Sequence, residues 1–254
     1  MTLLEVRDVG ISFGGVVALN DVSFEMERGK IFAVIGPNGA GKTTLFNIIS
    51  GSYRTDKGRV LLGGEEITHM LPHLRAQRGL QRTFQNLQIF EEMTALENVV
   101  VGNHLRQRTG FPAALLGLPL VGRETRAAES RARELLELMG LSDVSDTRAG
   151  DLAYGQQKRL EIARALAAHP LLLLLDEPAA GLNPAETAAL GEIIVRIRDS
   201  GIGILLVEHD MRLVMGISDE MLVLNFGRPI ARGTPDAVAK DDAVIEAYLG
   251  TEVD

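Results

Sequence analysis

The chain has 254 residues, of which 46% are hydrophobic and 24% are charged, enough for one large domain or one domain with an inserted subdomain. Its formal net charge of −8 argues against nucleic acid as a partner, and the lack of cysteine excludes disulfides and thiolate metal sites. No apolar run approaches the roughly 20 residues that span a bilayer, and the N-terminus lacks a signal-peptide pattern, so we expect a cytoplasmic protein.

The N-terminal part of the chain predicts strands and one helix. Residues 3–15 and 16–29 are expected to form two strands joined by a Gly-Gly turn. The apolar run "IFAVIG", from Ile31 to Gly36, is typical of a short buried strand, and residues 41–51 have helical spacing. Residues 58–67 predict an edge strand.

The rest of the chain is first helical and then alternates between strands and helices. Residues 94–106 and 123–140 have helical patterns, and a further helix is expected after Gly155. The elements that follow are a strand at 171–176, a helix at 184–200, a strand at 203–209, a hairpin at 221–233 and one or two short helices at 235–250. Strands that alternate with helices predict an α/β fold with a mostly parallel sheet. We therefore expect a core of residues 1–93 and 169–254, with residues 94–168 inserted as a helical subdomain.

The segment "GPNGAGKT", residues 36–43, matches a phosphate-binding loop between a predicted strand and a predicted helix, which is the context that this motif requires. The glycines allow backbone N–H groups to surround phosphates, and the helix N-terminus adds a positive dipole. In such a loop Lys42 reaches the β- and γ-phosphates, and Thr43 binds Mg²⁺. The competing interpretation is a glycine-rich turn with a surface lysine.

Two adjacent acids end the leucine-rich strand "LLLLLDEP". Asp176 is expected to hold Mg²⁺ beside the phosphate loop, directly or through water. Glu177 is expected to act on the water that attacks the γ-phosphate. The alternative is that the two acids only cap the end of a strand.

Together these motifs resemble the ATP-binding subunits of ABC (ATP-binding cassette) transporters over nearly the whole chain. The resemblance implies a P-loop cassette with a RecA-like core, an N-terminal antiparallel β-subdomain and an inserted helical subdomain. It also implies an ATPase that uses ATP and Mg²⁺. The nucleotide contacts that it implies in the phosphate loop are Gly36, Pro37, Asn38, Gly39, Ala40, Gly41, Lys42, Thr43 and Thr44.

Three single residues take further roles from this resemblance. Gln85 in "TFQN" corresponds to a loop that senses Mg²⁺ and the membrane partner, and His209 in "VEHD" to the histidine that contacts the γ-phosphate. Phe13 in "ISFGG" corresponds to the aromatic residue that stacks on adenine. Each has a simpler alternative: a solvated loop residue for Gln85, a strand cap for His209 and a core position for Phe13.

The family signature, usually L-S-G-G-Q, is altered in this chain. It reads Leu152, Ala153, Tyr154, Gly155, Gln156, so no serine hydroxyl is available for the γ-phosphate held by a second subunit. One lost hydrogen bond to a charged group costs about 1.5–3 kcal/mol, which weakens a site without abolishing it. Lys42, Thr43, Gln85, Asp176, Glu177 and His209 are all present, although the family's D-loop segment, here "AAGLNP", has Asn183 where aspartate is usual. The segments "LAYGQQKRLEIARAL", "DEPAAGLNPAET" and "VIEAYLG" resemble the corresponding sequences of the ATPases of bacterial branched-chain amino acid importers.

The resemblance implies partners as well. Two such ATPase subunits, identical or related, are expected to close head-to-tail on the inner face of the membrane. Two transmembrane permease subunits and, indirectly, an extracytoplasmic solute-binding protein complete the system. The apolar stretch 111–122 is expected either to pack inside the helical subdomain or to help accept a helix of a membrane subunit. Alternatives for the whole chain are a urea or amide importer, a non-transport ABC ATPase, or a regulatory module without hydrolysis.

Overall fold

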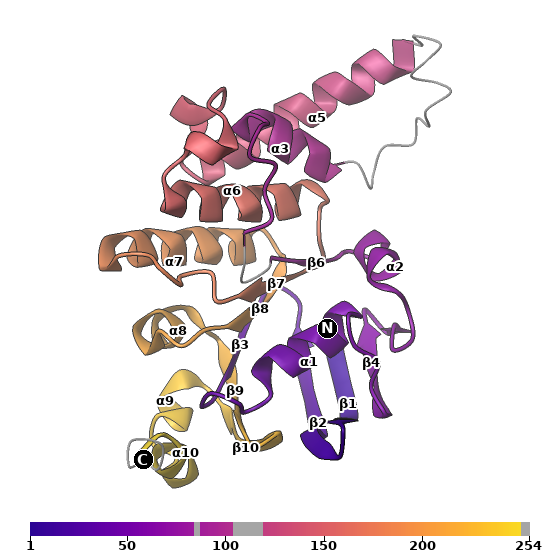
Figure 1. Ribbon diagram of the computed structural model, residues 1–254, viewed down its shortest axis with the longest axis vertical. Coiled ribbons are helices and arrows are strands. Elements are labelled where there is room, and N and C mark those ends of the chain that lie inside the picture. Colours follow the sequence, from indigo (N-terminus) through magenta and orange to yellow (C-terminus); the bar gives the residue numbers. More distant parts are fainter. Residues whose placement is uncertain (84–86, 104–118, 250–254) are drawn as a thin grey trace. The chain divides into compact units, whose positions relative to one another are not determined.

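The computed structural model describes residues 1–83, 87–103 and 119–249, with side chains of residues 119–124 and 249 excepted (Figure 1). The chain divides into two compact units. Unit 1 comprises Met1–Arg82 and Leu171–Asp254, and unit 2 comprises Thr83–Pro170. Among the described residues, no helix is both long enough and apolar enough to span a membrane.

The N-terminal part of unit 1 is an antiparallel sheet with the strand order β2-β1-β4-β5. Its strands are β1 (Thr2–Phe13), β2 (Val16–Glu27), β4 (Lys57–Leu62) and β5 (Glu65–Glu66). The predicted Gly-Gly turn joins β1 to β2. The expectation of a single edge strand at 58–67 was wrong, because Gly63 and Gly64 turn the chain at positive φ. That segment is a hairpin in which β4 pairs with β1 as well as with β5.

The second sheet of unit 1 is mostly parallel, as the alternation of strands and helices predicted. Among the described residues it has the order β10-β9-β3-β8-β7-β6. Its strands are β3 (Ile31–Ile35), β6 (Leu80–Arg82), β7 (Leu172–Asp176), β8 (Gly203–Val207), β9 (Glu220–Asn225) and β10 (Arg228–Gly233). Every residue of β3, β7 and β8 is buried, because these continuous apolar runs are covered on both faces. Only β10 runs antiparallel to its neighbour.

Helices cover both faces of this sheet (Figure 1). Those of unit 1 are α1 (Lys42–Ser50), α2 (Pro72–Gln77), α7 (Pro184–Asp199), α8 (Met211–Ile217), α9 (Pro235–Val238) and α10 (Asp242–Leu249). Helix α1 lies on the side of the N-terminal sheet, and its apolar side chains join one core with both sheets. Helices α7 and α8 lie on the opposite side. The short elements α2, β6 and α8 were not predicted, because each spans too few residues to show a period.

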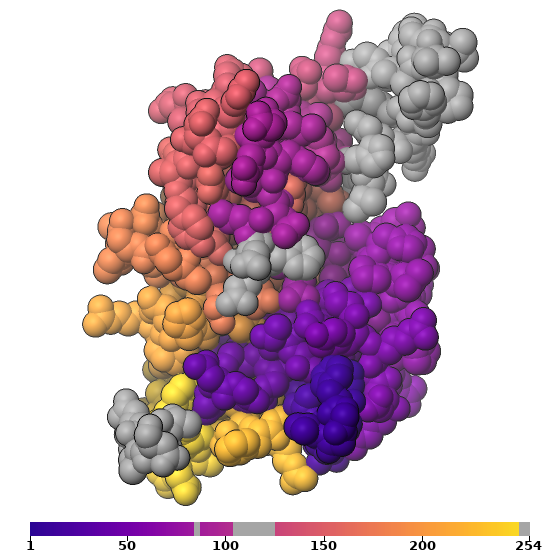
Figure 2. Space-filling model, in the orientation of Figure 1, coloured from indigo at the N-terminus to yellow at the C-terminus, as the bar shows by residue number. Residues whose placement is uncertain are grey.

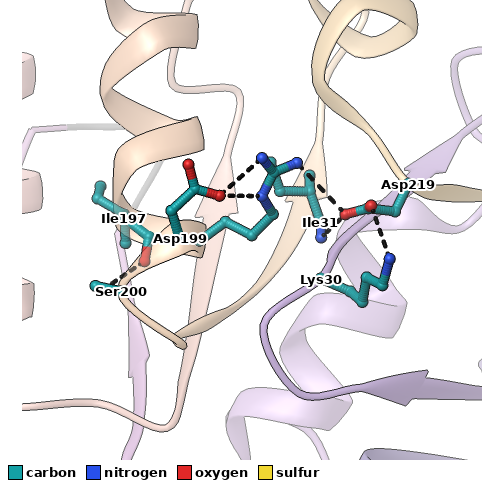
Figure 3. Close-up of polar contacts among 7 residues, drawn as sticks. Lys30, Ile31, Ile197, Asp199, Ser200 and Asp219 are labelled. Atoms are coloured by element: carbon teal, nitrogen blue, oxygen red, sulfur yellow. Dashed lines mark hydrogen bonds and ion pairs between the residues drawn. The ribbon is translucent and has the colours of Figure 1, made fainter.

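A polar cluster fastens the amino ends of β3 and β9 to the end of α7 (Figure 3). The Asp219 carboxylate accepts the backbone N–H of Ile31 at 2.8 Å and the ammonium of Lys30 at 3.1 Å. Arg198 lies between Asp219 and Asp199, with contacts of 3.8 Å and 2.8 Å. This cluster fixes the end of β3 that is remote from the phosphate loop.

Unit 2 is helical. It contains α3 (Ala95–Gly102), α5 (Pro119–Leu138) and α6 (Tyr154–Ala167), with short 3₁₀ turns at Ser142–Val144 and Ala149–Asp151. Helix α3 packs so closely on α6 that a Cβ at Gly102 would lie 2.2 Å from the carbonyl oxygen of Arg164. The expected helix at 94–106 ends at Gly102. Most of the apolar stretch at 111–122 lies outside the described residues, so neither interpretation of it is tested.

Candidate functional site

The chemistry-bearing segments of unit 1 follow three adjacent strands. Strand β8 lies between β3 and β7 in the sheet, and all three run parallel. Strand β3 leads into the phosphate loop, β7 ends at Asp176, and β8 is followed by Glu208 and His209. Because the carboxyl ends of parallel strands share one edge, these segments meet there, which is where ligands bind in open α/β sheets.

The phosphate loop requires glycine at both of its ends. Gly36 has a φ of 146°, and a Cβ there would lie 2.1 Å from the carbonyl oxygen of Leu224. Gly41 has a φ of 102° and stands at the N-cap of α1, where no side chain caps the helix. The N–H groups of the first helical turn therefore face the loop, as anion binding requires. Asn38, Gly39 and Thr43 are exposed, Gly36, Pro37, Gly41, Lys42 and Thr44 are half-buried, and Ala40 is buried.

Lys42 connects the loop to the acids. Its ammonium donates hydrogen bonds to the carbonyl oxygens of Gly36 at 2.6 Å and Pro37 at 2.9 Å. Burial lowers the pKa of Lys42, while the negative charges of Glu177 and Asp176 act to raise it. Those charges reach Lys42 from the end of β7, so the phosphate loop and the two acids belong to one site.

The two adjacent acids have different surroundings. Asp176 is 4% exposed, and its Oδ2 accepts a hydrogen bond from the guanidinium of Arg82 at 2.7 Å. Glu177 has a φ of 48°, and its backbone N–H donates to the carbonyl oxygen of Val207 at 2.8 Å. This left-handed conformation is uncommon for a non-glycine residue, although Asp8, Asp21, His169 and Phe226 adopt it as well. The two carboxylates therefore lie in different environments, and their separate roles stay a prediction.

Glu177 faces the histidine that follows β8. His209 Nδ1 lies 3.9 Å from Glu177 Oε2 and 3.7 Å from Glu208 Oε2. The His209 side chain is 67% exposed, whereas the Glu177 side chain is 25% exposed. The histidine is thus open to a ligand at the same edge where Glu177 ends β7.

Sequence reasoning missed Glu208, whose side chain is fully buried. Its Oε1 accepts the backbone N–H of Ala179 at 2.7 Å, and its Oε2 accepts those of His209 at 2.9 Å and Asp210 at 3.3 Å. A buried charge that is satisfied in this way fixes the backbone around it. The only signal in the sequence was its place directly before His209.

Phe13 is the last residue of β1 and lies at the surface rather than in the core. The start of the chain, to which β1 belongs, is coloured indigo in Figure 2. Its side chain is 45% exposed and meets the ring of Tyr53 edge-on, with 5.3 Å between the ring centroids. Tyr53 is 41% exposed and was not predicted as a site residue. The two rings are not coplanar, so the surface at the end of β1 on which a ligand could stack is that of a single exposed ring. Such a surface suits stacking by a planar base.

The altered signature lies in unit 2, at the start of α6. Ala153 is the N-cap residue, and the helix begins at Tyr154, two residues earlier than we expected. The side chains of Ala153 and Tyr154 are exposed, whereas Gly155 is buried within the first turn. The Gln156 side-chain oxygen accepts the N–H of Ala153 at 3.0 Å. The helix start is therefore capped from Gln156, because Ala153 has no side-chain acceptor.

The remaining predicted residue is Gln85, which lies outside the described residues. Of the others, Lys42, Asp176, Glu177 and His209 come together at one edge of the parallel sheet, on the evidence of the charges and contacts above. Among the residues that the structure describes, no group of three or more His, Cys, Asp or Glu side chains is arranged to hold a metal ion.

Two family models match the chain. One, described as "ABC transporter", matches residues 19–180. The other, described as "Branched-chain amino acid ATP-binding cassette transporter", matches residues 228–254. The second match covers β10 and the C-terminal helices.

Curated proteins and solved structures give concordant matches. The chain is 47% identical to the high-affinity branched-chain amino acid transport ATP-binding protein BraF of Pseudomonas aeruginosa, over 98% of each chain. It is 45% identical to LivG of Escherichia coli, which carries the same description, again over 98% of each. The ADP conformation of MJ1267, an ATP-binding cassette of an ABC transporter, superposes with a TM-score of 0.85 at 33% identity, over 98% of this chain and 99% of that one.

Proposed function

Because this chain belongs to the ABC transporter family, we propose that it binds and hydrolyses ATP to power the import of branched-chain amino acids. The observation that carries the proposal is the site at the edge of the parallel sheet. There the ammonium of Lys42 lies within reach of the charges of both Asp176 and Glu177, and Glu177 faces His209. In this proposal Lys42 is the phosphate-binding cation, Asp176 the metal-binding acid, Glu177 the base and His209 a second polar group.

The phosphate loop holds the nucleotide in this proposal. The uncapped N-terminus of α1 and the loop's backbone N–H groups bind phosphate oxygens, and Lys42 leaves its two carbonyl partners for the β- and γ-phosphates. Phe13, with Tyr53 behind it, stacks on adenine. The half-exposed state of Phe13 supports this role over a core position.

The residues present fit a magnesium ion. Mg²⁺ in nucleotide sites takes one or two carboxylates, a hydroxyl and substrate phosphates rather than a cage of protein ligands. The Thr43 hydroxyl and the Asp176 carboxylate supply such a donor set, and Arg82 occupies one of the two carboxylate oxygens. When bound, the ion offsets phosphate charge during transfer. Gln85 is proposed to join this metal site.

Glu177 is proposed to orient and deprotonate the attacking water, and His209 to stabilise the γ-phosphate as charge develops. The Glu177 carboxylate lies 3.9 Å from His209 Nδ1, whereas the Asp176 carboxylate is paired with Arg82, which supports the division of labour. A positioned base of this kind contributes about 10²–10⁴-fold to rate.

Hydrolysis is proposed to require a second ATPase subunit, identical or related, in a head-to-tail dimer. The signature residues 152–156 would then face the γ-phosphate of the partner site, with Gln156 and the α6 N-terminus in place of a serine hydroxyl. Two transmembrane permeases bind the dimer on the inner face of the membrane, and a solute-binding protein delivers the substrate. The names of the relatives and the C-terminal match at residues 228–254 support branched-chain amino acids as that substrate.

Replacing Glu177 by Gln tests the proposal. Turnover of ATP by the assembled transporter should fall about 10²–10⁴-fold, while ATP affinity is retained and an ATP-bound dimer accumulates. Uptake of leucine into vesicles that contain the chain with its permeases should fall in parallel. Hydrolysis at the parent rate by this variant would remove Glu177 as the base. Uptake of urea but not of leucine by the parent complex would overturn the substrate.

A further inference from the structure

Arg82 lies at the end of β6 with its side chain only 8% exposed. One nitrogen of the guanidinium, Nη2, donates to Asp176 Oδ2 at 2.7 Å, and the Asp176 side chain is 5% exposed. The other, Nη1, donates to Asn47 Oδ1 at 2.6 Å and to Ser50 Oγ at 3.0 Å. The same group lies 5.9 Å from the centroid of the Phe46 ring. A planar guanidinium held from both ends in this way has little freedom to reorient.

The partners of Arg82 belong to two elements that the proposed metal site depends on. Asn47 and Ser50 lie in α1, the helix whose first turn contains Thr43, and Asp176 ends β7. The guanidinium therefore ties the helix that supplies the hydroxyl to the strand that supplies the carboxylate. It also engages a single oxygen of Asp176, Oδ2, and a metal ion needs only one carboxylate oxygen.

We propose that Arg82 is a positioning residue for the magnesium ligand Asp176, holding its carboxylate in the orientation in which the second oxygen binds the ion. This inference rests on the metal role of Asp176 in the proposed function. Groups that hydrogen-bond to metal ligands orient them, and their loss typically costs about 10–100-fold in metal affinity. In this proposal Arg82 acts through Asp176 and is not itself a ligand of the metal.

A second effect of Arg82 has the opposite sign. Its positive charge repels a cation that approaches Asp176, so its removal would by charge alone strengthen metal binding. ATP brings several negative charges to the ion, and these outweigh one guanidinium that is already paired. We therefore expect the loss of orientation to dominate, and the two effects give opposite results in one measurement.

The measurement is the affinity of the folded protein for AMP-PNP, a nucleotide that it does not hydrolyse, by calorimetric titration with Mg²⁺ and with EDTA. The ratio of the two affinities is the contribution of the metal and does not depend on turnover. In Arg82→Met this ratio should fall about 10–100-fold while the affinity in EDTA stays near the parent value. Arg82→Lys keeps the positive charge but lacks the planar guanidinium that donates from two nitrogens, so its ratio should lie between those of the parent and of Arg82→Met.

Asn47→Ala removes one of the two acceptors on the far side of the guanidinium, leaving Ser50, and does not touch Asp176. It should lower the same ratio by a smaller factor, and it carries the test if thermal melting shows that Arg82→Met is unfolded. Arg78→Met is the matched control, because Arg78 is more exposed and pairs with Glu65 instead. Its ratio should equal that of the parent.

Three outcomes overturn the proposal: a ratio that rises in Arg82→Met, a ratio that stays at the parent value in a folded Arg82→Met, or, where Arg82→Met is unfolded, a ratio that stays at the parent value in Asn47→Ala. Asp176→Asn separates this from a failure of the proposed function. If the parent affinity does not depend on Mg²⁺, or if Asp176→Asn leaves that dependence intact, the metal role of Asp176 is wrong. If Asp176→Asn abolishes the dependence and the Arg82 variants do not change it, only the positioning role is wrong.

Discussion

The buried carboxylate of Glu208 accepts the backbone N–H of Ala179, with 2.7 Å between Oε1 and the nitrogen. Ala179 follows Glu177 by two residues, and Glu208 directly precedes His209. One side chain thus joins the loop after β7 to the loop after β8, and its second oxygen accepts two N–H groups of its own loop. Glu177 and His209, 3.9 Å apart, lie in the two loops that this side chain joins, so we expect it to help hold their spacing.

Glu208→Gln should therefore lower both stability and turnover. The amide keeps one acceptor oxygen but presents an NH₂ group to N–H donors, leaving buried donors unpaired at about 1–3 kcal/mol each. We expect a loss of that size in the free energy of unfolding in urea, and slower ATP hydrolysis. Glu192→Gln is the control, because the Glu192 side chain is 75% exposed. If the two variants unfold alike, the buried carboxylate does not hold the loops.

Phe13→Ala should lower nucleotide affinity far more than stability. The side chain is 45% exposed, so the loss in unfolding free energy should lie well below the roughly 3–5 kcal/mol of a buried phenylalanine. Loss of stacking on a base costs about 1–3 kcal/mol of binding free energy. Phe90→Ala is the matched control, because Phe90 is 46% exposed but lies in unit 2. Equal ATP affinities in calorimetric titrations of both variants would contradict the adenine contact.

Local patterns predicted the parts of the site that are continuous in the chain. The apolar run of β3, the glycines of the loop and the helical spacing of α1 lie within 20 residues, so sequence alone indicated that strand, loop and helix follow one another. The acids that end β7 were found in the same way. Each of these segments has a period or a motif that is visible without its neighbours.

The residues that hold these segments together were not predicted. Arg82 and Asp176 are 94 positions apart, and Glu208 and Ala179 are 29 apart. Nothing in the residues around Arg82 indicates that it is buried, since "QRTFQ" reads as a polar segment. Pairing between distant strands, here β6 beside β7, decides which side chains meet. The edge position expected for residues 58–67 was wrong for the same reason, because β4 pairs with β1 from the start of the chain, whereas the turn at Gly63 and Gly64 is local.

Ala153→Ser should stabilise the start of α6. Serine at an N-cap accepts an N–H of the first turn, and Ser is favoured over Ala there by about 1 kcal/mol. We expect an increase of that size in the free energy of unfolding, and tighter ATP-dependent dimers, because the hydroxyl also suits the partner's γ-phosphate. Ala188→Ser, at an exposed position inside α7, should instead lose a few tenths of a kcal/mol. If Ala153→Ser raised the free energy of unfolding no more than Ala188→Ser does, the capping role of a serine at residue 153 would be contradicted.

The last prediction concerns the pH dependence of ATP binding, which follows from the charges around Lys42. Burial lowers the pKa of Lys42 from its ordinary value of 10.5, and Glu177 is the larger of the two charges that oppose this. Glu177→Gln removes one upward contribution, so the pKa of Lys42 should fall further. Phosphates bind the ammonium and not the neutral amine. The affinity should therefore begin to fall at a lower pH in Glu177→Gln than in the parent.

The measurement is the affinity for AMP-PNP at a series of alkaline pH values below 10.5, compared by the pH at which half of the affinity is lost. That comparison is needed because Glu177→Gln also removes repulsion of the γ-phosphate and raises the affinity at neutral pH. Lys42→Arg provides the control, since a guanidinium remains charged throughout the range and its affinity should stay flat. A midpoint that is unchanged or higher in Glu177→Gln would show that Glu177 does not act on Lys42, and the common site of the loop and the acids would lose its main support.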